Sequence, residues 1–293
     1  MIEYPDDEAT EAESEKHGIP EEVLIRDLVR VVEVLNMKAK GFFGSQRVLA
    51  GSMALRFFNS PRFTVYDADF ATAVDAQPGR KELEELLRYS DDDLEITPTS
   101  PTPHDARGTA WGSEPITYVP AFTSLAPEGS REFKADIASR GLVLPGIERE
   151  FRLPYDLGIW EEAPSLWIMD PHEVVAEKTL GWVVNRQVKH YADLGFIALG
   201  TTTSPKPLFV LDGGVLRETP AAKLEIMRGV QPDRHAAWPS IDHVVGTLEE
   251  DPVFGGGQWE RIVYVRARRD RFKPELLMAA VQRILVPMLK GAG

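Results

Sequence analysis

The pattern of apolar and polar positions divides the chain into a mixed first part and a mostly helical second part. Apolar residues at helical spacing over 23–40 predict an amphipathic helix that ends at Gly41. Further helices are predicted at 53–58 and 81–89. Short apolar or alternating runs predict strands at 47–50, 63–73, 116–122 and 133–139. Residues 91–131 are otherwise rich in Pro, Thr, Ser and Asp, which is typical of a long loop.

The second part begins with a clear helix start. Asp170 can cap a helix, Pro171 suits its first turn, and Glu173 completes a capping box, so a helix is expected to about Arg186. More helices are expected at 188–199, 221–228 and 274–289, the last kinked or shortened by Pro287, with a strand at 260–265. The pattern therefore predicts an α+β domain over 23–165 and a mostly helical domain over 166–293.

Charge is concentrated at the N-terminus. Residues 1–22 carry nine acidic side chains against Lys16 alone, and so supply −8 of the net charge of −13. Such a segment typically stays flexible or lies loosely on the surface. The remaining chain is only mildly acidic, and its charge does not exclude an RNA substrate.

Several classes of protein and site are excluded by simple counts. No apolar run approaches the ~20 residues that a bilayer span needs, and no secretory signal is present, so a cytoplasmic protein without a membrane partner is expected. The chain has no cysteine, which excludes disulfides and thiolate metal sites. Its six histidines show no metal-ligand spacing, and the glycines at 255–257 lack the spacing of a phosphate-binding loop, which favours a flexible turn.

Asp67 and Asp69 lie two residues apart on a predicted strand, so both carboxylates project from one face. Carboxylates held that close repel each other unless a cation lies between them, and Mg²⁺ prefers oxygen ligands. In a chain with 46 acidic residues, such a pair also arises by chance on a solvated surface. The pair alone leaves both interpretations open.

Two neighbouring features favour a site. Gly51-Ser52 joins a short strand to a helix, where glycine lets the backbone approach a ligand and free N–H groups suit a phosphate. Asp136 falls on the face of its strand opposite to Phe133 and Ile137, which is unusual for a central strand unless that face lines a site. An ordinary capped turn and an edge strand with one wet face are the alternatives.

Two charged residues of the second part also need partners. Lys178 lies in the middle of an apolar helix face, so its ammonium must extend to solvent or meet an anion. Asp193 precedes an apolar run and can pair with Lys178, Arg186 or Lys189. A structural salt bridge explains such a pair as well as a functional one does.

In combination, the order Gly-Ser, short helix, Asp-x-Asp and later strand carboxylate resembles the signature of the nucleotidyltransferase superfamily. The likeness extends to the AbiEii-type toxins, which include MenT-like toxins of toxin–antitoxin systems, and covers roughly residues 45–200. The matching segments are Gly51-Ser52-Met53-Ala54-Leu55-Arg56, Asp67-Ala68-Asp69-Phe70, Glu177-Lys178-Thr179-Leu180 and Lys189-His190-Tyr191-Ala192-Asp193-Leu194. The chain departs from the family at Ala50, Thr179 and Tyr191-Ala192, where a glycine, part of the lysine motif and an aspartate are usual.

This resemblance implies a nucleotidyltransferase-like mixed sheet with flanking helices, followed by a mostly helical C-terminal domain. It implies transfer of a nucleotide from an NTP, with Mg²⁺ or Mn²⁺ as cofactor and release of pyrophosphate. Asp67 and Asp69 would hold the metal on the triphosphate. Asp136 would complete a second metal site and help to deprotonate the acceptor hydroxyl.

The remaining roles follow from the same resemblance. Gly51 and Ser52 would hold the β- and γ-phosphates, and Lys178 would neutralise charge on the triphosphate. Asp193 would orient Lys178 or the nucleotide.

The resemblance further implies tRNA as the acceptor, extended at its 3′ end, and a cognate antitoxin as a partner. A basic stretch with one aromatic residue at 265–273 can track a phosphate backbone, although a solvated turn before the last helix is the slightly favoured interpretation. A protein hydroxyl or an aminoglycoside remains open as the acceptor, because an acidic body suits a cationic antibiotic. A non-enzymatic interaction module whose carboxylates are structural also remains open.

Overall fold

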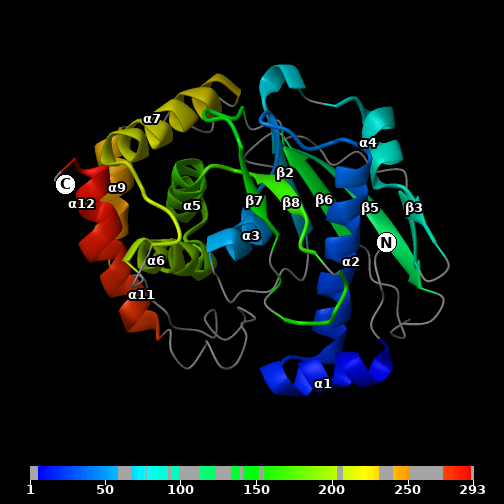
Figure 1. The fold of residues 1–293 in the computed structure, drawn as a ribbon. Coiled ribbons are helices and arrows are strands. Elements are labelled where there is room, and N and C mark those ends of the chain that lie inside the picture. The colour runs from blue at the N-terminus through cyan, green and yellow to red at the C-terminus, as the bar shows by residue number, and fades with distance from the viewer. Residues whose placement is uncertain are drawn as a thin grey trace. The chain divides into compact units, whose positions relative to one another are not determined.

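A mixed sheet of eight strands organises the first of two compact units in the described part of the chain (Figure 1). The computed structural model describes residues 6–58, 67–76, 78–91, 94–98, 113–122, 133–138, 141–151, 153, 155–160, 162–202, 207–230, 240–250 and 273–291. The first unit comprises Met1–Ala54, Phe63–Arg140 and Gly146–Ile168, and the second comprises Leu55–Arg62, Gly141–Pro145 and Met169–Gly293. The division predicted near residue 165 lies close to the passage of the chain between units after Ile168, while two short segments cross earlier.

The strand order is β3-β4-β5-β6-β2-β1-β8-β7. The strands are β1 (Arg47–Leu49), β2 (Asp67–Thr72), β3 (Tyr89–Ser90), β4 (Leu94–Pro98), β5 (Ser113–Phe122), β6 (Phe133–Ala138), β7 (Ile147–Glu150) and β8 (Ser165–Ile168). The pairs β2–β6 and β1–β8 are parallel, and the other neighbouring pairs are antiparallel. Strand β2 is therefore central, and its Ala68 and Phe70 are fully buried.

Helix α2 (Glu21–Ala39) supplies much of the core of this unit. Its Leu24, Leu28 and Val31 recur on one face and are buried, as the apolar spacing predicts. Phe42, just after the helix, packs edge-on against Phe70 of β2 at a centroid distance of 5.6 Å. The described part of this unit also contains α3 (Gly51–Ala54), the 3-10 turn η2 (Val74–Ala76), α4 (Arg80–Leu87) and an N-terminal helix.

The acidic N-terminal segment contains a helix, α1 (Asp7–His17), where the sequence predicts a flexible tail. The Asp6 carboxylate caps its start by accepting from Ala9 N at 2.8 Å, and Gly18 closes its end in the left-handed conformation. Glu13 is buried and accepts from Asp156 N at 3.2 Å and from His17 Nε2 at 2.8 Å. Burial acts to raise the pKa of Glu13, but hydrogen bonds from Lys16 and from Asp156 N hold it below its ordinary value.

The regular secondary structure in the described part of the second unit is helical. It contains the 3-10 turn η1 (Leu55–Phe58) and the helices α5 (Pro171–Asn185), α6 (Val188–Thr202), α7 (Gly213–Val230), α9 (Ile241–Glu249), α11 (Pro274–Ala280) and α12 (Val286–Leu289), with a π-helical turn η3 (Val281–Leu285) between the last two. Val188, Ala192 and Phe196 of α6 pack against Leu277 of α11. Gly195 permits the close approach, because a Cβ there would lie 2.7 Å from Leu277 Cβ.

Helix α7 differs from the prediction, whereas the closing helix is interrupted at Pro287 as predicted. Helix α7 starts at Gly213, before Pro220, because Asp212 caps it by accepting from Val215 N at 3.0 Å. The closing helix is interrupted before Pro287, which has no N–H for an α-helical bond, and the chain widens into the π turn there. Within the described residues, no helix combines the length and apolarity needed to cross a membrane.

Candidate active site

The turn from β1 into α3 brings the backbone of Gly51 against the side chain of Asp69. Ala50 N donates to the carbonyl oxygen of Asp69 at 2.8 Å, which holds the turn beside β2. Gly51 has φ of +60°, and a Cβ at this position would lie 1.8 Å from Asp69 Oδ2. Only glycine fits without displacing the carboxylate, so Gly51 and the half-buried Asp69 form one local structure.

The parallel pairing of β2 with β6 brings the predicted acidic positions together. Asp69 is the register partner of Asp136, and Asp67 is the register partner of Lys134. Positions 67 and 69 share one face of the sheet by the alternation of a strand, and position 136 lies beside 69 in the register. For Asp67 and Asp136 the description covers the backbone alone, so their assignment as metal ligands stays a prediction.

The residue types at these positions are ones that a divalent cation can take as ligands. Carboxylate oxygens on adjacent central strands are the donor type that Mg²⁺ and Mn²⁺ take. Because Gly51 has no side chain, the Asp69 carboxylate can occupy the volume that a Cβ at position 51 would fill. Ser52, in the first turn of α3, is buried.

In the second unit, Lys178 pairs with Asp193, one of the three pairings that the sequence leaves open. Lys178 Nζ lies 2.9 Å from Asp193 Oδ2. Asp193 is fully buried and Lys178 is 8% exposed, so solvent and salt screen the attraction between the two charges only weakly. The ion pair gives each of these two charges an opposite charge and links α5 to α6. The roles predicted for the two residues in catalysis are not tested by this pairing.

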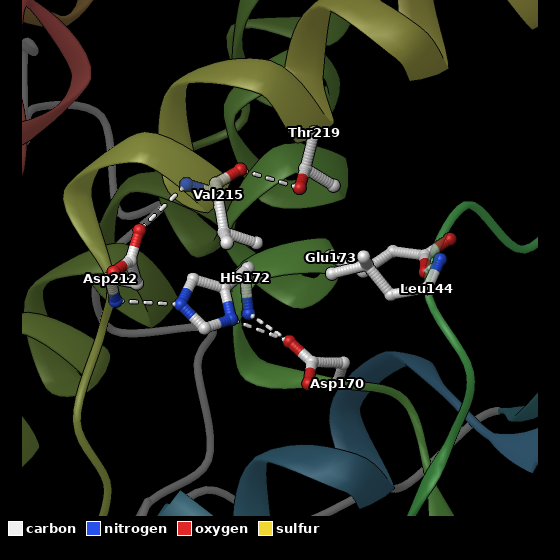
Figure 2. Close-up of polar contacts among 7 residues, drawn as sticks. All are labelled: Leu144, Asp170, His172, Glu173, Asp212, Val215 and Thr219. Atoms are coloured by element: carbon white, nitrogen blue, oxygen red, sulfur yellow. Dashed lines mark hydrogen bonds and ion pairs between the residues drawn. The ribbon is translucent and has the colours of Figure 1, made fainter.

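The first turn of α5 is built differently from the predicted capping box. Asp170 caps the helix, accepting from His172 N at 2.9 Å and contacting His172 Nδ1 at 2.7 Å (Figure 2). His172 Nε2 accepts from Asp212 N at 2.8 Å, so the hydrogen lies on Nδ1 and the ring joins the starts of α5 and α7. Glu173 serves another partner, since its two carboxylate oxygens accept from Val143 N and Leu144 N at 3.0 and 2.9 Å.

Glu173 also contacts Lys223 of α7, a residue that the sequence analysis did not single out. Lys223 Nζ lies 2.5 Å from Glu173 Oε1. Burial raises the pKa of the Glu173 carboxyl above its ordinary value of 4.5, and the Lys223 ammonium and the Leu144 N–H oppose that rise. Lys223 shares a buried face of α7 with Leu216 and Thr219. A helix predicted to start after Pro220 excludes those two residues, so the sequence pattern did not show that Lys223 is buried.

Some predicted features lie outside the described residues. These are the basic stretch at 265–273, the glycine-rich turn at 255–257, the strand at 260–265 and much of the loop between 91 and 131.

Comparison with known proteins places the chain in a family. The sequence model of the nucleotidyl transferase AbiEii toxin, type IV toxin–antitoxin system, matches residues 34–226. The fold is similar to MenT4, a nucleotidyltransferase toxin from Mycobacterium tuberculosis H37Rv, with a TM-score of 0.54 and 17% identity over 96% of this chain and 98% of that one. A putative nucleotidyltransferase from Helicobacter pylori matches with a TM-score of 0.45 and 14% identity over 94% of this chain and 99% of that one. No curated protein matches the chain.

The family match spans well over half of the chain and contains the Gly-Ser turn, the Asp-x-Asp strand, Lys178 and Asp193. The fold likeness agrees with the predicted α+β class with a nucleotidyltransferase-like mixed sheet and a helical C-terminal part. This chain belongs to the AbiEii nucleotidyltransferase toxin family, whose members use a divalent metal and an NTP.

Proposed function

We propose that this protein transfers a nucleoside monophosphate from an Mg²⁺-bound NTP to the 3′ end of tRNA. A tRNA extended in this way can no longer be charged, so translation and growth stop. The observation that carries the proposal is the contact of the Gly51 backbone with Asp69, on a strand whose register partner at that position is Asp136. Membership of a toxin family supports the biological outcome.

The chemistry is an in-line displacement at the α-phosphorus. The acceptor hydroxyl oxygen forms the new bond, the bond to pyrophosphate breaks, and the hydroxyl proton passes to Asp136. Asp67, Asp69 and Asp136 would hold the divalent cations, which supply charge stabilisation to the attacking and leaving oxygens when bound. Mn²⁺ can replace Mg²⁺ because both take carboxylate oxygens.

The remaining residues bind and orient the triphosphate. Gly51 and Ser52 hold the β- and γ-phosphates through backbone N–H groups. Lys178 neutralises charge that develops on the triphosphate, and Asp193 fixes the direction of the lysine through their 2.9 Å contact. We expect the reaction to take place in the cytoplasm, and a cognate antitoxin to restrain it.

The test is incubation of the protein with total tRNA, Mg²⁺ and each α-labelled NTP in turn. Label is expected in the tRNA band, and Asp69→Ala is expected to abolish it. Asp75→Ala, an exposed residue just after β2, is the matched control and should label as wild type does. Periodate oxidation of the tRNA removes the terminal diol and should prevent labelling if the 3′ end is the acceptor.

Other outcomes lead to other conclusions. Label on a protein or an aminoglycoside but not on tRNA would keep the enzyme class and overturn the acceptor. Labelling of tRNA by Asp69→Ala at the wild-type rate would overturn the assigned site. Failure of the wild type to bind any Mg²⁺–NTP would favour a non-enzymatic interaction module.

A further inference from the structure

Three charged side chains are buried together between α5, α7 and the segment 141–145. Lys223 Nζ lies 2.5 Å from Glu173 Oε1 and 3.2 Å from Glu177 Oε1. The same ammonium donates to the carbonyl oxygen of Gly141 at 3.2 Å. Lys223 is 1% exposed, Glu173 is 0% exposed and Glu177 is 8% exposed. We call this group the Lys223 cluster.

The cluster also holds backbone. The carboxylate of Glu173 accepts from both Val143 N and Leu144 N, so the 141–145 segment is bound through two N–H groups and one carbonyl. Figure 2 shows the side chains of Glu173 and His172 extending from α5 in different directions, toward Leu144 and toward Asp212. Helix α5 is thus fixed against the segment on one side and the start of α7 on the other.

A buried ionic cluster is an unusual choice if its purpose is stability alone. Taking three charges out of water is costly, and apolar side chains of similar volume often stabilise a fold at least as well. Ion pairs and hydrogen bonds instead fix the relative positions of the segments that they join, because each bond requires a particular distance and direction.

Two parts of the proposed site are connected to the cluster by the chain. Lys178 follows Glu177 directly on α5 and reaches Asp193 on α6. The 141–145 segment follows β6, the strand that carries Asp136. We propose that Lys223 and Glu173 are positioning residues for nucleotidyl transfer, which set the orientation of α5 and therefore the placement of Lys178 on the triphosphate. This inference rests on the proposed function.

The test is a double-mutant cycle on nucleotide affinity, measured by equilibrium binding of Mg²⁺ with ATP, CTP, GTP or UTP. Lys223→Met is expected to weaken binding of the preferred NTP by about fivefold or more while circular dichroism stays unchanged. In a Lys178→Met background, the same change should weaken binding by less than about twofold, because Lys223 acts through Lys178. Lys223→Arg keeps the charge and should restore most of the affinity. Lys290→Met, which breaks an exposed pair with Glu249 in the same unit, is the matched control and should have no effect.

The outcomes separate this inference from the function on which it rests. A folded Lys223→Met protein with wild-type affinity, or equal losses in both backgrounds, would overturn the positioning role and leave the proposed function standing. If Lys223→Met does not fold, Glu173→Gln takes its place in the cycle with the same expectations. A wild type that binds no Mg²⁺–NTP would overturn the proposed function, and this inference with it.

Discussion

At position 51 the backbone has φ of +60°, and a methyl group there would overlap the Asp69 carboxylate. Gly51→Ala must therefore displace Asp69, because the strained backbone cannot move away from the turn that Ala50 N holds. We expect transfer to fall by about 10²-fold, the scale of a 1 Å misplacement of a catalytic group. The free energy of unfolding should fall by only about 1–2 kcal/mol, the scale of a left-handed residue with a side chain.

Gly44→Ala is the matched control for this change. A Cβ at Gly44 meets no atom within 4 Å, and its φ lies outside the left-handed range. Initial rates of label transfer for the two variants, beside their urea unfolding curves, decide the matter. Equal rates for Gly51→Ala and wild type would show that the Asp69 carboxylate needs no fixed position.

Glu173 gives a prediction on pH, because burial raises the pKa of its carboxyl above 4.5. Between the ordinary and the raised pKa, the folded state holds the proton more tightly than the unfolded state does. Stability therefore falls as pH rises through this window, and the loss is complete above the folded pKa. Glu173→Gln cannot titrate, so the wild type should lose stability relative to this variant as the pH rises through 4.5 and above it.

Urea unfolding of both proteins across that range measures the difference. Glu162→Gln, at an exposed position, should follow the wild type throughout. A difference that stayed constant or grew in favour of the wild type with rising pH would contradict the raised pKa.

Among the elements, the C-terminal end of α4 is capped by a side chain from α2. Asn36 of α2 is buried, and its Nδ2 donates to the carbonyls of Leu86 and Arg88 at 2.8 and 3.2 Å. The last carbonyls of a helix lack partners within it, so Asn36→Ala should remove the donor to Leu86 O and lower the free energy of unfolding by about 1–3 kcal/mol. The Arg88 carbonyl keeps its second donor, Lys40 Nζ. Thermal and urea unfolding would measure the loss.

Asn36→Asp refines this test, because it keeps the shape, removes the N–H donor and adds a negative charge beside the helix C-terminus. It should destabilise at least as much as Asn36→Ala. Lys38→Ala, on the exposed side of α2, should change the free energy of unfolding by less than about 0.5 kcal/mol. A tolerated Asn36→Asp would mean that packing, not donation, is what this residue supplies.

The elements that the sequence predicted well have a strong apolar period, as α2 does, or a clear cap at their start, as α5 does. Helix α1 was not predicted, because its stability comes from caps at Asp6 and Gly18 and from the contacts of Glu13, not from an apolar face. Strands β3 and β7 are short and depend on their partners, so no local pattern reports them. Pro220 suggested that α7 starts after it, but the cap at Asp212 starts the helix earlier and Pro220 lies inside it.

At the scale of the whole molecule, contacts within one motif were easier to predict than contacts between distant segments. The order of the Gly-Ser turn, short helix and Asp-x-Asp strand resembles a family signature and so placed both motifs in one predicted site, and Gly51 lies against Asp69 in the structure. The choice of Lys178 as the partner of Asp193 required the packing of α5 on α6, which no pattern in either helix specifies. The Lys223 cluster joins three segments far apart in the chain, and nothing local predicts such a meeting.

Charge is the other property of the whole molecule that bears on function. The net charge is −13, and the surface of α1 contributes through the exposed Glu8, Glu11 and Glu15. These carboxylates repel the phosphates of an RNA acceptor over about one Debye length, which is ~10 Å at 0.1 M salt. Changing all three to Gln should therefore lower the KM for tRNA by about twofold to threefold at low salt, with kcat unchanged.

The same three positions changed to Asp keep the charge and provide the matched control, whose KM should equal that of the wild type. Raising the salt to about 0.5 M shortens the Debye length well below 10 Å, so the advantage of the Gln variant should shrink. Circular dichroism of both variants checks that α1 remains helical. An advantage that persists at high salt would point to a direct contact of α1 with the acceptor. No change in KM at any salt would indicate that the α1 carboxylates lie farther than a Debye length from the bound tRNA.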